Sequence, residues 1–197
     1  MSLPRLRRRV DVLTFASWRA GLPGLAVPAW IGPGPGLPAP AGAPRGVTVP
    51  PMAGAALAVV NDPRVSVLFA VRGGAPASTG CVALADEVAA ALVRHEPVDE
   101  AAWVEIALIP VERAVDEVVR WLPPDPADGR LLVAHLARPG EPPGWSCRWT
   151  ARGGSWHEGE PGDHPAGPAD VVDRLRSALC AGVAGRPAGP RAPVGEP

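Results

Sequence analysis

Short apolar segments separated by turn residues fill the middle of the chain. They are VSVLFAVRG, TGCVALAD, EVAAALVRHE and AWVEIALIP, and they lie between Val65 and Pro110. Gly, Pro or acidic residues bound each one, which is typical of strands joined by turns. In the first segment Val65, Val67, Phe69 and Val71 recur at every second position and so share one face. The pattern predicts an antiparallel meander.

For two segments the sequence pattern fits either a strand or a helix. EVAAALVR, within residues 87–95, has good helix formers, whereas both of its neighbours have strand patterns. We interpret Val88–His95 as a strand that pairs with Cys81–Ala85 across a turn at Asp86-Glu87. GRLLVAHLA, which includes residues 130–137, fits either element. By contrast, Trp103–Ile109 alternates clearly and is predicted as a strand.

An amphipathic helix is predicted directly after this strand. Pro110 suits the first turn of a helix, where its missing N–H costs nothing, and Pro123-Pro124 end it. Its expected apolar stripe is Val111, Ala114, Val115, Val118, Val119 and Leu122, and its expected outer face is Glu112, Arg113, Asp116, Glu117 and Arg120.

The remaining elements are predicted from local signals. We expect a strand at Val10–Leu13, followed by a helical turn FASWRAGL that Thr14 caps. A helix over Met52–Val60 ends at Asn61-Asp62-Pro63. Near the end of the chain we expect a hairpin turning at Gly153-Gly154 and then a helix over Pro168–Val183.

These elements predict one α+β domain over residues 1–183, with an antiparallel sheet backed by the helix at 111–122 and the C-terminal helix. Residues 22–51 are rich in Pro and Gly, which predicts a long connector. Residues 184–197 are expected to be a disordered tail.

Composition excludes several functions. The chain has no Lys, so it cannot carry a Walker-type phosphate loop, a Schiff-base lysine or a kinase-like site. Its net charge of −1 gives no general attraction to nucleic acid, and we interpret the Arg5–Arg9 patch as a solvated, frayed terminus. No segment is apolar for long enough to span a membrane. Cys81, Cys147 and Cys180 lack metal-site spacing and are expected as reduced, buried thiols in the cytoplasm.

One cluster of residues resembles a chemical site. SWHEGEPGDH places imidazoles and carboxylates within eight residues, as a divalent metal or an acid–base pair would require. Glycines and Pro161 prevent the helical spacing of known zinc motifs, so a solvated acidic loop is the preferred interpretation. A small hydrolase or metal-dependent enzyme that uses this loop is the alternative. The cluster comprises His157, Glu158, Glu160, Asp163 and His164.

The other candidate residues favour a binding protein. His95 and His135 end apolar runs and are expected to be edge or core residues, and no set of nucleophile, base and orienting group can be assembled. Trp18, Trp103 and Trp121 are expected in the core. Trp145, Trp149 and Trp156 have polar neighbours, so they are expected as either surface contacts or core.

Several passages resemble the EspG-like (ESX secretion-associated) family. They are VDVLTFASWRAGLPGLAVP, PMAGAALAVVNDPRVSVLFAVRGG, the strand and helix VEIALIPVERAVDEVVRWLPP at Val104–Pro124, and GGSWHEGEPGD with the helix at Ala169–Leu179. The resemblance implies a cytosolic, non-enzymatic chaperone or adaptor of a type VII secretion system that needs no cofactor. Its implied partners are helical secretion substrates of PE/PPE or WXG100 type. No motif fixes the partner-binding residues, and a further alternative is a structural, regulatory or protein-interaction module of another pathway.

Overall fold

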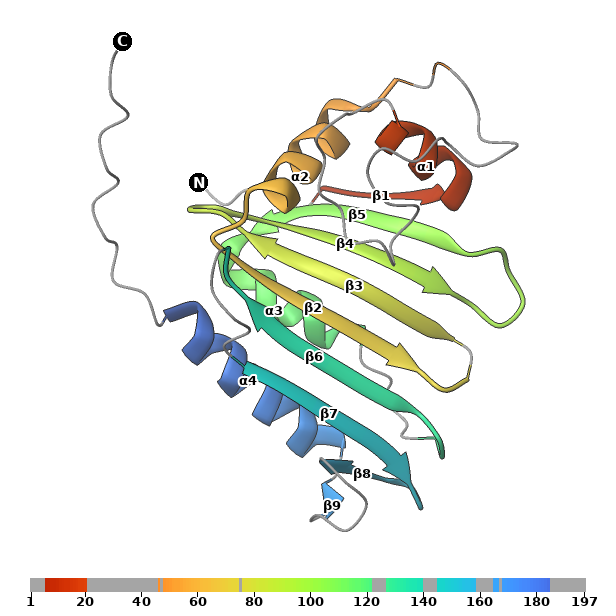
Figure 1. Ribbon diagram of the computed structural model, residues 1–197, viewed down its shortest axis with the longest axis vertical. Coiled ribbons are helices and arrows are strands. Elements are labelled where there is room, and N and C mark those ends of the chain that lie inside the picture. Colours follow the sequence, from red (N-terminus) through yellow and green to blue (C-terminus); the bar gives the residue numbers. More distant parts are fainter. Residues whose placement is uncertain are drawn as a thin grey trace.

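In the described part of the chain the strands form one antiparallel sheet of nine (Figure 1). The computed structural model describes residues 6–20, 46, 48–74, 76–121, 127–139, 145–158, 165–166 and 168–184. Across the sheet the strands follow the order β1-β5-β4-β3-β2-β6-β7-β8-β9. They are β1 (Leu6–Asp11), β2 (Val65–Arg72), β3 (Ala77–Leu84), β4 (Val88–Glu96), β5 (Trp103–Pro110), β6 (Leu131–Ala137), β7 (Trp145–Arg152), β8 (Ser155–Glu158) and β9 (Pro165–Ala166).

Helices cover parts of both faces of this sheet. On one face α1 (Val12–Ala20) packs on β1 and β5, and α2 (Pro51–Asn61) packs on β3, β4 and β5. On the other face lie α3 (Ala114–Val119) and α4 (Pro168–Ala184), drawn behind the sheet in Figure 1. The predicted α+β fold, a meander backed by helices, is confirmed.

The strand interpretation of Val88–His95 is also confirmed. Propensity alone favours a helix here, but β4 lies between β3 and β5 and is covered on both sides. Ala89, Ala91 and Val93 belong to the core beneath α3, while Ala90 and Leu92 belong to the core beneath α2. Two-sided burial explains the unbroken apolar run, because a central strand covered on both faces has no solvent-facing positions.

The structure corrects the N-terminal prediction. Leu6–Asp11 is not frayed: it forms the edge strand β1, which pairs with β5 from Leu6↔Leu108 to Asp11↔Trp103. The helix begins at Val12, and Asp11 rather than Thr14 caps it. The Thr14 amide donates to Asp11 Oδ1 at 2.8 Å, and its hydroxyl donates to Oδ2 at 2.6 Å.

The helix predicted over 111–122 is shorter than expected. A 3-10 turn at Val111–Arg113, labelled η2, leads into α3, which ends at Val119, and Leu122 lies outside the described residues. Ala114 and Val118 are buried as predicted. Glu117 was placed on the outer face, and this is wrong: it is 3% exposed, and its charge is neutralised by Arg7 of β1 and by Arg120, which directly follows α3.

Most other predicted elements are confirmed with small shifts. Met52–Val60 lies within α2, and the ambiguous segment at 130–137 contains β6. The hairpin at Gly153-Gly154 joins β7 to β8. The strand predicted from Cys81 begins earlier, because β3 starts at Ala77 and includes Gly80. Most of the connector at 22–51 and of the tail at 184–197 lies outside the described residues, while Ala184 still belongs to α4.

The tryptophans are distributed differently from the prediction. Trp18 is 1% exposed, which confirms its place in the core. Trp103 and Trp121 are only half-buried. Trp149 and Trp156, for which surface contacts were considered, are 1% and 2% exposed and belong to the core beneath α3 and α4. The side chain of Trp145 lies outside the described part of the chain.

Candidate functional site

Two buried carboxylates lie where β1, β5 and α3 meet. Glu105 of β5 accepts a hydrogen bond from Arg7 Nη1 at 2.8 Å and another from Arg120 Nη2. Glu117 of α3 accepts from both Nη atoms of Arg7 and lies 3.3 Å from Arg120 Nε. Arg9 approaches Glu105 Oε2 at 3.5 Å. Hydrogen bonding to Glu117 raises the pKa of Arg7 above its ordinary value.

This ionic cluster has the character of a structural tie. Paired carboxylates can serve as acid and base, but three of the four oxygens here accept hydrogen bonds from guanidinium groups, and the fourth, Glu105 Oε2, forms an ion pair with Arg9. The cluster joins β1 to the sheet and to α3, and removal of either partner would leave an uncompensated buried charge. Sequence reasoning missed it, because Arg7, Glu105 and Glu117 are far apart in the chain.

A second arrangement missed by sequence reasoning is the pair formed by Ser78 and His95. Ser78 Oγ lies 2.7 Å from Nδ1 of His95, at hydrogen-bond distance on neighbouring strands. The imidazole ring also lies against Trp103 and Trp121, with ring centroids 4.8 and 5.5 Å away. Burial, followed by the charge of Arg9, lowers the pKa of His95.

A nucleophilic serine needs both a base and access to a substrate. Ser78 has a base in hydrogen-bond contact, but it is only 5% exposed and lies beneath α3. Among the described residues the ring packs on tryptophans rather than on an orienting carboxylate. The geometry therefore fits a neutral histidine that fills its place in the core and satisfies a buried hydroxyl.

The residues predicted from SWHEGEPGDH are only partly described. His157 and Glu158 belong to β8, where His157 pairs with Thr150 of β7. Glu160, Asp163 and His164 lie outside the described residues. Within the described ranges no group of three or more His, Cys, Asp or Glu residues is placed to hold a metal ion.

The cysteines follow the prediction in part. Cys81 and Cys147 are buried, whereas Cys180 on α4 is exposed, so the expectation of three buried thiols is wrong at that position. Burial raises the pKa of Cys81 to about 12, which leaves its thiol protonated and unreactive at neutral pH.

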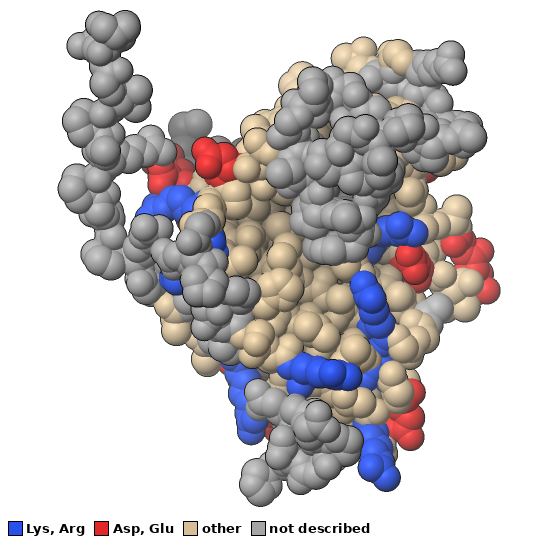
Figure 2. Space-filling model, in the orientation of Figure 1, with Lys and Arg blue, Asp and Glu red and all other residues tan. Residues whose placement is uncertain are grey.

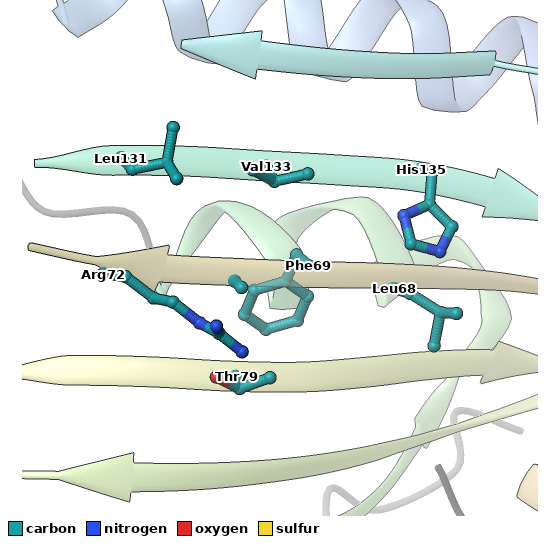
Figure 3. Close-up of a pocket in the computed structure, with 8 residues that line it drawn as sticks. Leu68, Phe69, Arg72, Thr79, Leu131, Val133 and His135 are labelled. Carbon is teal, nitrogen blue, oxygen red and sulfur yellow. The ribbon is translucent and has the colours of Figure 1, made fainter. Parts of the chain in front are cut away.

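The most distinctive surface is a groove beside α2 on the same sheet face (Figure 3). Figure 1 shows α1 and α2 over the β1 side of this face, while β2, β6 and β7 run on beyond them. We call this surface the β2–β6 groove; it encloses about 270 Å³. It is lined by Leu68, Phe69, Ala70, Arg72, Thr79, Leu131, Val133 and His135.

Strand register explains why the floor of this groove is apolar. Ala70 pairs with Val133 and Arg72 with Leu131, so these side chains share the face on which α2 lies. Leu68, Leu131 and Val133 remain half-buried. These partly exposed apolar side chains beside α2 provide a surface on which a partner could pack.

The surroundings of the groove are basic. Arg72, Arg148 and Arg152 are exposed and point to the same face, and within the described residues none has an acidic partner. Figure 2 shows arginines over this part of the face, while most acidic residues lie toward the edges of the view. Neither the apolar floor nor its basic border could be assembled before the strand order β3-β2-β6-β7 was known.

None of the described helices is both long and apolar enough to cross a membrane. Comparisons with protein-family models, with curated proteins and with solved structures find no match to this chain. Its kinship with the EspG-like family is therefore a proposal.

Proposed function

We propose that the protein is a non-enzymatic adaptor that binds a helical segment of another protein in the β2–β6 groove. The observation that carries the proposal is the uneven covering of one sheet face. On that face α1 and α2 bury β1, β5, β4 and β3, whereas Leu68, Leu131 and Val133 remain partly exposed.

A helix is the natural occupant of such a surface. Two-layer α+β domains bury an apolar sheet face against helices, and α2 already does so on the neighbouring strands. A partner helix beside α2 would continue this layer over β2 and β6. Its apolar stripe would contact the floor of the groove, as in other complexes in which a helix lies in a groove.

The partner class is proposed from the sequence resemblance. The passage at Val104–Pro124 and the N-terminal strand and helix resemble the EspG-like family. On this basis the partners are helical type VII secretion substrates of PE/PPE or WXG100 type, which the adaptor would keep soluble in the cytoplasm. This function requires no cofactor and no binding of nucleic acid.

Co-purification tests the proposal. The full chain is co-expressed with tagged PE/PPE and WXG100-type substrate pairs, alongside the variants Val133→Glu and Val98→Glu. Val133 lies in the groove, whereas Val98 is 64% exposed in the turn between β4 and β5 and provides a matched control. Circular dichroism and thermal unfolding establish that both variants fold.

We expect a substrate pair to co-purify with the unmodified chain and with Val98→Glu, and to be lost with Val133→Glu. Retention by both folded variants would exclude the groove as the binding site. Failure of every pair would contradict the type VII assignment. If the purified protein also held stoichiometric zinc, the metal-dependent alternative at His157–His164 would be favoured.

A further inference from the structure

The β2–β6 groove carries a charge pattern that restricts which partner helices can bind. This inference rests on the proposed adaptor function. Strand register places side chains of this face in rows across the sheet. One row runs from Thr79 of β3 through Ala70 and Val133 to Arg148 of β7. The adjacent row contains Arg72, Leu131 and Thr150. Apolar side chains therefore occupy the middle of each row.

The cations lie on both sides of this apolar floor. Arg148 is exposed on β7, beyond Val133. Arg72 is the last residue of β2, and Figure 3 shows its side chain extending across the sheet toward Thr79 of β3. Arg152 follows Arg148 on β7 and is exposed as well. A further arginine on this face, Arg94 of β4, is already paired with Glu96 at 2.9 Å.

The spacing of these cations fits the width of a helix. Two inter-strand steps of about 4.8 Å separate β2 from β7, which gives roughly 10 Å between the backbones of Arg72 and Arg148, and the Arg72 side chain extends further toward β3 (Figure 3). A helix with its side chains is about 10 Å wide and would fit between them along β2 and β6. Its flanks would then face Arg72 on one side and Arg148 on the other.

Within the described residues the charge of the groove has no counterpart on the strands that form it. On this face the described outward positions of β2, β6 and β7 include Arg72, Arg148 and Arg152 but no Asp or Glu. Complementary charges at the rim of an interface favour one partner and discourage others. A helix with basic flanks would be repelled, and a neutral one would gain no ion pairs with the exposed guanidinium groups.

We infer that the β2–β6 groove takes an amphipathic helix of a partner protein with carboxylates on both sides of its apolar stripe. Leu68, Leu131 and Val133 contact the stripe. Arg72 and Arg148 pair with Glu or Asp side chains on the two flanks, which orients the helix along the strands. The carboxylates thus determine which helices bind, while the apolar floor provides the contact area.

Three designed helical peptides test this inference without a known partner. They share one stripe of Leu and Ala and carry Glu, Gln or Lys on both flanks. Their affinities for the full chain are measured by fluorescence anisotropy at low and high salt. We expect the Glu peptide to bind about tenfold more tightly than the Lys peptide at low salt, with the difference shrinking as salt rises.

Arginine variants provide the matched controls. In the variant carrying both Arg72→Gln and Arg148→Gln we expect the preference for Glu over Lys to fall below about twofold. Arg113→Gln, on η2 at the opposite face, leaves the preference unchanged. Equal binding of all three peptides to the unmodified chain would overturn the charge inference and leave the adaptor function standing. If no peptide binds and no substrate pair co-purifies, both are overturned.

Discussion

Arg7 and Glu117 form a two-pronged ion pair although 110 residues separate them in the chain. Arg7 Nη1 donates to Glu117 Oε1 at 2.8 Å, and Nη2 donates to Oε2. The Glu117 side chain is 3% exposed and that of Arg7 is 27% exposed. The pair joins β1 to α3 and shares Arg7 with Glu105 of β5. The first strand of the chain is thereby tied to the centre of the fold.

Removal of Arg7 tests this tie. Arg7→Met leaves the carboxylates of Glu105 and Glu117 buried with fewer donors, so we expect a loss of about 3 kcal/mol in the free energy of unfolding. Arg8→Met is the matched control, because the exposed Arg8 side chain lies 5.8 Å from the Trp18 ring and forms no ion pair with any described residue. Its expected cost is below about 1 kcal/mol. Equal costs in urea unfolding would show that the buried pair is not what holds β1.

Gly80 is expected to tolerate no side chain. A Cβ there would lie 2.4 Å from Phe69 Cζ and 2.9 Å from Val93 Cγ2, inside the core beneath α3. We expect Gly80→Ala to destabilise the fold by about 1–3 kcal/mol, through overpacking. Gly54→Ala in α2 is the control, since its Cβ would meet only Val49 Cγ1 at 3.9 Å. That variant is expected to gain up to about 1 kcal/mol from helix propensity. Thermal unfolding that ranks the two variants in the opposite order would refute this packing argument.

The Asp11 cap makes the stability of α1 depend on pH. Hydrogen bonds from the Thr14 hydroxyl and amide hold the pKa of Asp11 below its ordinary value. Because the pKa of Asp11 is lower in the folded state, the contribution of this cap to the free energy of unfolding is complete above the unfolded pKa of about 3.9. That contribution is lost as pH falls through the folded pKa. Asp11→Ala should cost about 1 kcal/mol at pH 7.

Asp11→Asn keeps the capping hydrogen bond but removes the titratable group, because the amide oxygen still accepts a hydrogen bond and carries no charge. We expect this variant to retain most of the stability at pH 7 and to lose the part of the acid dependence that Asp11 causes. The measurement is urea unfolding between pH 2 and pH 7. An unchanged acid dependence in both variants would rule out the cap as its source.

The pKa of His95 is expected to lie below that of an ordinary histidine. Burial and then Arg9 lower its pKa, while Glu105, Glu100 and Glu96 oppose the shift. The neutral form therefore stabilises the fold fully above the unfolded pKa of about 6.5, and this contribution is lost as pH falls through the folded value. We expect a midpoint below 6.5 for the His95 ring in an NMR titration, and a weaker loss of stability below pH 6.5 in His95→Gln. A midpoint at or above 6.5 would contradict the proposed environment.

Local patterns in the sequence determined most of the elements. Alternation predicted β2 and β5, the paired glycines predicted the hairpin between β7 and β8, and Asn61-Asp62-Pro63 gave the end of α2 to within a residue or two. Period, turn chemistry and breakers act over a few residues, so they are readable without the fold. The neighbours of EVAAALVR also supplied enough context to favour a strand there.

Tertiary structure decided what those elements do together. The arginine-rich N-terminal segment forms the edge strand β1, where Arg7 donates hydrogen bonds to the buried Glu105 and Glu117. The tertiary structure also placed β6 beside β2, which brings Val133 next to Ala70 and creates the β2–β6 groove. Both results depend on pairing between distant segments, which burial and charge neutralisation select. The sequence by itself determined an α+β meander with helices, whereas the strand order determined where a partner could bind.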